Sequence, residues 1–148
     1  MIVTAAFLHH LAAFVLVAML AVELVLLRLP ITAENAKRLG AIDGVLGASA
    51  GVLLIVGLLR VFFFEKGAAY YFSSHAFLTK FGLFIVIGLA SIVPTMEFMR
   101  WRKAMKAGRA PDPDPKKMQT IRRIVHWELA GVVLILLCAA MMARGGFI

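Results

Sequence analysis

The stretch that decides the fold is LHHLAAFVLVAMLAVELVLLRL, residues 8–29. It is about twenty residues long, which is the length that an α-helix needs to cross a hydrocarbon core of roughly 30 Å. Three further apolar runs of similar length follow, at residues 44–64, 77–98 and 125–143. The sequence therefore predicts an all-α protein, an integral membrane four-helix bundle with up-down topology, in which residues 1–148 form a single transmembrane domain.

The composition supports this prediction. Of the 148 residues, 62% are hydrophobic and only 16% are charged, whereas soluble domains carry roughly a quarter charged residues. The single cysteine, Cys138, lies within an apolar run, which excludes a disulfide framework and zinc sites built on paired cysteines. The sequence also lacks a phosphate-binding glycine loop and any set of catalytic residues that would line a soluble groove. We therefore expect neither a hydrolase nor a kinase.

The distribution of basic residues predicts the orientation in the membrane. Twelve of the sixteen Lys and Arg residues belong to the loop after the first run and to the basic loop at 100–123. Because basic loops stay in the cytoplasm, we expect both termini on the periplasmic side of a bacterial cell inner membrane. The net charge of +8 then reflects topology and contact with anionic lipids at the cytoplasmic face of the bilayer, and nucleic acid is not an expected partner.

Ionisable side chains within apolar runs are costly in hydrocarbon, so each should face the bundle interior and find a partner there. They form two groups by depth. The group nearer the predicted periplasmic side combines histidine with cations: His9, His10, Arg60, His75 and Lys80. The group nearer the cytoplasmic side is mostly carboxylate: Glu23, Asp43, Glu97, His126 and Glu128.

Helical phase refines the first run. His9 and Glu23 share one face, because fourteen residues at 100° each bring them within about 40° of one another. His10 lies nearer the flank of this face, so His9 is expected to point inward. Glu23 needs an inward partner, and the candidates are Asp43 through a shared proton, His126, Arg122 and Arg123.

Small residues and one proline are expected to shape the interior. Gly47 and Gly51 belong to a series of glycines in the second run that permits close approach of a neighbouring helix or of a flat cofactor. Pro94 removes a helical hydrogen bond from the third run. The predicted kink lies beside Glu97 and either forms a polar pocket or ends the helix.

Six segments carry a resemblance to known proteins: FLHHLAAF, IDGVLGASAGVLLIVGLLR, FFFEKGAAYYFSSHAFLTK, SIVPTMEFMRWRK, RRIVHWELAG and MMARGG. Together they resemble a small bacterial inner-membrane family catalogued as a domain of unknown function, a four-helix predicted membrane protein. The layout is also distantly similar to the small four-helix protoporphyrinogen oxidase and to cytochrome b-like and copper-resistance D-type membrane bundles. In those bundles a histidine near the start of the first helix serves haem or a related tetrapyrrole. The resemblance implies His9 or His10 as axial ligand and Lys80 as the motif lysine.

Two hypotheses of function follow. The first is a membrane protein that binds haem b and has a redox or tetrapyrrole-related role, as a haem-dependent membrane oxidoreductase would. In it, His9 or His10 binds the iron, His75 or Lys80 supplies a second ligand or a propionate contact, and Arg60 offsets propionate charge. The second is a cofactor-free structural, accessory or ion- or proton-translocating protein that uses the carboxylate-rich group. Both hypotheses are compatible with a homo-oligomer or a larger membrane complex.

Overall fold

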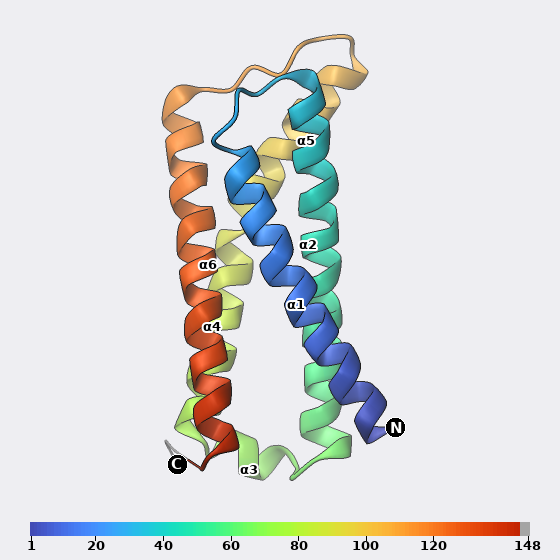
Figure 1. The fold of residues 1–148 in the computed structure, drawn as a ribbon, viewed down its shortest axis with the longest axis vertical. Coiled ribbons are helices and arrows are strands. Elements are labelled where there is room, and N and C mark those ends of the chain that lie inside the picture. The colour runs from blue at the N-terminus through green and yellow to red at the C-terminus, as the bar shows by residue number, and fades with distance from the viewer. Residues whose placement is uncertain (146–148) are drawn as a thin grey trace.

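The fold is given by a computed structural model that describes residues 1–145. Within these residues the regular structure is helical: α1 (Ile2–Leu26), α2 (Ala33–Leu59), the short π-helix η1 (Arg60–Phe64), α3 (Ala68–Phe72), α4 (His75–Ala90), α5 (Ile92–Lys106) and α6 (Pro115–Ala143). Four segments are long and apolar enough to span a membrane: Ile2–Leu26, Ala33–Phe64, His75–Lys106 and Pro115–Ala143. They run alternately in opposite directions (Figure 1). The predicted all-α membrane helical bundle is confirmed.

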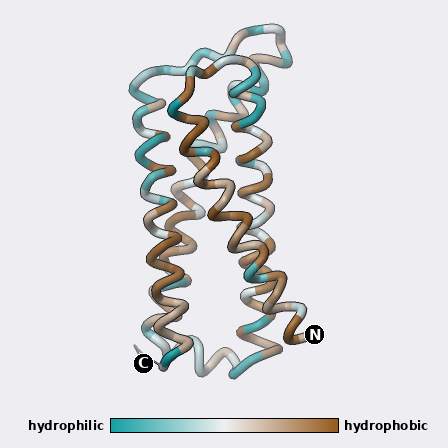
Figure 2. The backbone as a smooth tube through the Cα atoms, in the orientation of Figure 1, coloured by the Kyte–Doolittle hydropathy of each residue, from teal (hydrophilic) through white to brown (hydrophobic). Residues whose placement is uncertain are grey.

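The bundle has two ends with different chemistry. The start of α1, the helix α3 and the end of α6 lie at one end, which we call the terminal end (Figure 1). The connections at 27–32 and 107–114 lie at the other, which we call the basic end. Polar residues extend well down the helices from the basic end, whereas the helices are apolar through their middle parts (Figure 2). This separation is what a bilayer boundary requires of spanning helices.

The helices extend beyond the apolar runs, which corrects the expectation of a loop over 100–123. Only residues 107–114 of that stretch lie outside α5 and α6. Pro115 is tolerated because it is the first residue of α6, where its missing N–H has no intrahelical partner. The Asp114 side chain caps the same helix by accepting a hydrogen bond from the N–H of Lys116 at 3.2 Å.

The third span bends where the sequence places a proline. The helix is interrupted at Ser91, between α4 and α5, and Pro94 cannot donate the next hydrogen bond to Ala90. The predicted kink is therefore confirmed, and it changes the packing partner of the span. Helix α4 packs on α6, whereas α5 packs on α2.

This bend separates a closed half of the bundle from an open half. The hydrophobic core is concentrated toward the basic end, where Phe98 and Trp101 of α5 are buried with ring centroids 5.5 Å apart. Ile121 and Val125 of α6 are fully buried in the same core. Toward the terminal end, α1 pairs with α2 and α4 pairs with α6, and the ribbons of the two pairs diverge (Figure 1).

Gly47 and Gly51 of α2 are not approached closely by a neighbouring helix. A Cβ atom added at Gly47 or Gly51 would meet no atom within 4 Å. The prediction of close helix packing at these two positions is therefore wrong, because the bend holds α4 against α6 rather than against α2, whereas contact with a flat cofactor stays a prediction. The tight approach occurs instead at Gly131 of α6, where an added Cβ would lie 2.7 Å from Cδ1 of Ile87 in α4.

Candidate functional site

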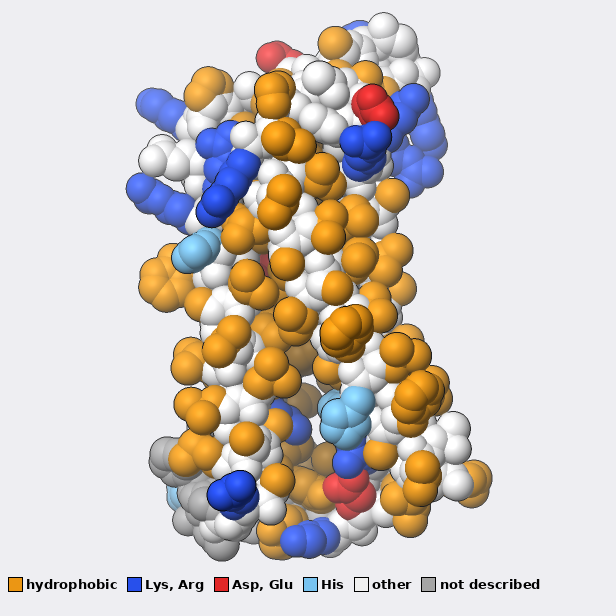
Figure 3. Space-filling model, viewed as in Figure 1, with side chains coloured by type: hydrophobic (Ala, Val, Ile, Leu, Met, Phe, Trp, Pro, Cys, Tyr) orange, Lys and Arg blue, Asp and Glu red, His pale blue; other side chains and the backbone are white. Residues whose placement is uncertain are grey.

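The space between the helix pairs is a cavity of about 600 Å³. It is visible as a hollow between α1 and α6 in the terminal half of the molecule, with histidine and charged side chains around it (Figure 3). Apolar side chains such as Leu16, Phe84 and Val132 line its walls. Cavities of this size, largely apolar with a few convergent polar groups, are typical of binding sites for small molecules and cofactors.

The outer end of the cavity, toward the terminal end, brings together four of the five residues predicted for the first polar group: His9, His10, Arg60 and Lys80. His9 is the more buried histidine of the pair, which confirms the prediction from helical phase. Its Nδ1 atom is buried and has no hydrogen-bond partner among the described residues. Its ring lies over Gly57, where an added Cβ would be 3.3 Å from Cε1 of His9.

The other histidines differ from His9. His10 is exposed, and its Nδ1 donates a hydrogen bond to the carbonyl oxygen of Ala6 at 2.6 Å. His75 is exposed at the start of α4 and is not among the residues that line the cavity. The structure therefore does not bring His75 to the other four residues.

Two residues that sequence reasoning missed complete the outer end. Glu65 accepts hydrogen bonds from Arg60, with Nε at 2.6 Å, and from the hydroxyl of Tyr71. Partial burial opposes ionisation of Glu65, but the hydrogen bonds from Tyr71 and Arg60 and the charge of Arg60 lower its pKa below the ordinary value. Burial and the hydrogen bond to Glu65 raise the pKa of Tyr71 to about 12. Glu65 is five positions after Arg60, and the π-helix η1 between them has the wide turn that brings residues at this spacing together.

The inner end of the cavity, midway through the bundle, is acidic. Three carboxyl side chains from three helices meet there: Glu23 of α1 is 1% exposed, Asp43 of α2 is 9% exposed and Glu128 of α6 is 2% exposed. Asp43 and Glu128 line the cavity, and their charges act on Glu23. We call these three residues the carboxyl cluster.

The carboxyl cluster contains few hydrogen bonds. Asp43 Oδ1 accepts one from the hydroxyl of Thr95 at 3.0 Å, a residue that the sequence did not single out for this role. Oε2 of Glu23 and Oε1 of Glu128 are buried without a partner among the described residues. Asp43 is therefore a neighbour of Glu23 as predicted, whereas the shared proton stays a prediction.

The remaining two members of the predicted carboxylate-rich group lie elsewhere. Glu97 is equally buried but is paired with Arg100 at 2.5 Å and with Lys117 at 2.8 Å. His126 is exposed and lies in a groove beside Arg122 and Arg123. Neither side chain is a partner of Glu23. Within residues 1–145, no set of three or more His, Cys, Asp or Glu side chains has the geometry to hold a metal ion directly.

Comparison with known proteins supports the membrane assignment. The model of a family described as predicted membrane protein (DUF2214) matches residues 2–146. No curated protein and no solved structure matches the chain. The match covers all four spanning segments and therefore includes both ends of the cavity.

Proposed function

The chain belongs to the DUF2214 family of predicted membrane proteins, and from this premise we propose that it binds haem b in the cavity between the helix pairs. The observation that carries the proposal is the unpartnered Nδ1 atom of His9, buried at the outer end of a largely apolar cavity. A buried polar atom without a partner costs free energy, and a bond from Nδ1 to a ligand in the cavity would remove that cost.

The neighbours of His9 suit the rest of the cofactor. Lys80 and Arg60 lie close enough to His9 for their charges to act on it, and both line the cavity. Lys80 would offset the charge of one propionate of haem b, and Arg60, which is paired with Glu65, would contact the other through its remaining N–H groups, while the apolar walls match the macrocycle. His10 stands one residue away as the alternative axial ligand. Haem b would supply one-electron redox chemistry, and these side chains would hold and orient it.

An absorption spectrum of the purified protein tests this proposal. We expect a Soret band in protein produced with sufficient haem, and its loss in a His9→Ala/His10→Ala double variant. The matched controls are His75→Ala and His126→Ala, which remove histidines that lie outside the cavity. A colourless parent protein, or a band that survives the double variant, would refute haem binding through these histidines.

A second function is favoured by a separate observation, the carboxyl cluster at the inner end of the same cavity. We propose that these residues bind protons and exchange them through the cavity. Three ionised carboxylates this deeply buried, with no cation bonded to them among residues 1–145, would repel one another in a medium of low dielectric constant. Binding of protons removes this repulsion, and Asp43 and Glu128 are reachable from the cavity.

Infrared spectroscopy distinguishes proton binding from the haem proposal. The carbonyl stretching band of protonated carboxylic acid should be present at neutral pH in the parent and weaker in Glu23→Gln and Glu128→Gln variants. Glu97→Gln is the control, because Glu97 is buried to the same extent but paired with two cations. The Soret band should not change in any of the three. A band of equal intensity in parent and cluster variants would contradict proton binding.

We further propose that the terminal end faces the periplasm of a bacterial cell. The support is the concentration of twelve of the sixteen Lys and Arg residues in the connections at the basic end and the helix ends next to them. The cavity would then open on the periplasmic half of the membrane. A reporter enzyme that is active only in the periplasm should be active when it is fused after Ile148. Activity of a reporter that functions only in the cytoplasm, fused at the same position, would reverse the orientation.

A further inference from the structure

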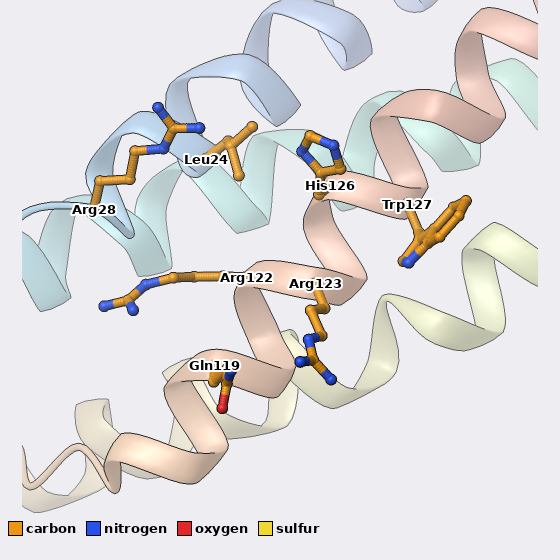
Figure 4. A pocket seen from close by; sticks show the side chains of 7 residues that line it. All are labelled: Leu24, Arg28, Gln119, Arg122, Arg123, His126 and Trp127. Atoms are coloured by element: carbon orange, nitrogen blue, oxygen red, sulfur yellow. The ribbon is translucent and has the colours of Figure 1, made fainter.

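We propose that a groove between α1 and α6 near the basic end is a binding site for the headgroup of an anionic phospholipid. The groove has a volume of about 340 Å³ and is separate from the cavity described above. Leu24 of α1 and Arg28, in the turn that follows α1, form one wall. The other wall is a single helix: Gln119, Arg122, Arg123, His126 and Trp127 of α6 (Figure 4).

The spacing on α6 shows that this surface is a continuous stripe. Positions 119, 122, 123 and 126 recur at intervals of three and four residues, so they share one face of the helix. On the opposite wall, Leu24 lies in the last turn of α1 and Arg28 lies just beyond its end. The polar face of α6 therefore lies opposite the end of α1 and the basic residue that follows it.

The charge of the groove is of one sign. Three guanidinium groups line it, from Arg28, Arg122 and Arg123, and no acidic side chain does. Among residues 1–145 none of the three forms a salt bridge, whereas Arg38 and Arg100 at the same end each pair with a glutamate. Within the described residues, the protein supplies no anion to the groove. Guanidinium groups bind phosphate oxygens in paired hydrogen bonds, so a phosphate would balance the charge of these arginines.

One of these arginines is held in place. Arg122 extends toward α1 (Figure 4), and its Nε donates a hydrogen bond to the carbonyl oxygen of Leu27 at 2.8 Å. This bond uses one donor of the guanidinium group and leaves the others for a ligand. Arg122 therefore links the two walls and fixes the width of the groove.

The position of the groove favours a lipid over a soluble anion. It lies where the apolar part of α6 meets its basic part, as the change in hydropathy along the helix shows (Figure 2). Trp127 is 74% exposed at this level, and tryptophan favours the boundary between headgroups and hydrocarbon. A phospholipid seated here would place its phosphate among the arginines and its acyl chains beside Leu24 and Trp127. Basic pockets between spanning helices bind anionic headgroups in this manner.

Binding of cardiolipin to the full chain in a neutral detergent tests the site. Native mass spectrometry would count bound lipid, with phosphatidylcholine as the neutral probe. We expect an Arg28→Gln/Arg123→Gln variant to bind cardiolipin at least about tenfold more weakly, because two charge-assisted contacts are removed. Arg122 is left intact because it holds Leu27.

The matched control is Arg102→Gln/Lys103→Gln, which removes the same charge from the exposed end of α5. This control should bind cardiolipin within about threefold of the parent, because its charges lie outside the groove. Equal weakening by both double variants would show diffuse electrostatic attraction and overturn the proposal. Competition by inorganic phosphate at equal strength, or equal binding of phosphatidylcholine, would also overturn it. Unchanged thermal unfolding of the lipid-free variants shows that each has folded.

Discussion

Replacement of Glu23 by leucine should make this protein more stable. Glu23 is 1% exposed, its Oε2 has no hydrogen-bond partner among the described residues, and two further carboxyl groups act on it. An unsatisfied buried polar group costs about 1–3 kcal/mol, and an apolar side chain in its place removes that cost. Since leucine has a similar size and favours helix, we expect Glu23→Leu to raise the free energy of unfolding by about 1–3 kcal/mol.

Glu97 provides a control with the opposite sign. It is 2% exposed, but its carboxylate accepts hydrogen bonds from Arg100 and pairs with Lys117. Glu97→Leu removes both ion pairs and should lower the free energy of unfolding. We expect a loss of about 1–3 kcal/mol rather than the larger loss from a fully buried pair, because the two cations are 53% and 46% exposed and regain water.

Unfolding in mixed micelles, titrated with a denaturing detergent, measures both free energies in one assay. The expected result is a pair of changes of opposite sign for two glutamates with the same burial. A loss of more than about 1 kcal/mol in Glu23→Leu would refute the reasoning, since it would mean that Glu23 has a stabilising partner in the native protein. Glu23→Gln, which retains the need for hydrogen bonds, should change the stability by less than about 1 kcal/mol.

Two further predictions concern the outer end of the cavity. Glu65 has a pKa below its ordinary value in the folded protein, so its contribution to stability is present above about pH 4.5 and is lost as the pH falls through the folded pKa. Glu65→Gln should therefore reduce the acid sensitivity of thermal unfolding. An unchanged dependence of the unfolding temperature on pH would contradict the pairing of Glu65 with Arg60 and Tyr71. Gly57→Leu should displace His9 and destabilise the protein by about 1–3 kcal/mol. Gly51→Leu is the control and should be neutral or stabilising, because a Cβ atom at position 51 has open space around it. Equal losses of unfolding free energy in the two variants would show that α2 is packed differently.

The sequence by itself determined the architecture of this protein. The chain contains four apolar runs and a biased distribution of cations, whatever the packing of its helices. Each apolar run must form a helix, because a span satisfies its backbone hydrogen bonds within itself. The inward orientation of His9 also followed from the sequence, since helical phase depends only on the number of residues from Glu23. The bend at Pro94 was predictable for the same reason, as the missing N–H is local.

Only the tertiary structure decided which polar residues belong together. Glu23, Glu97 and Glu128 were indistinguishable as carboxylates in apolar runs, yet Glu97 is paired with cations and the other two meet Asp43 at the cavity. The difference arises because the bend of the third span moves α5 onto α2 and leaves α4 on α6. Helical phase specifies the face on which a side chain lies, whereas the direction of the bend specifies which helix that face meets. The cavity and the groove both depend on these helix pairings, which involve residues far apart in the chain.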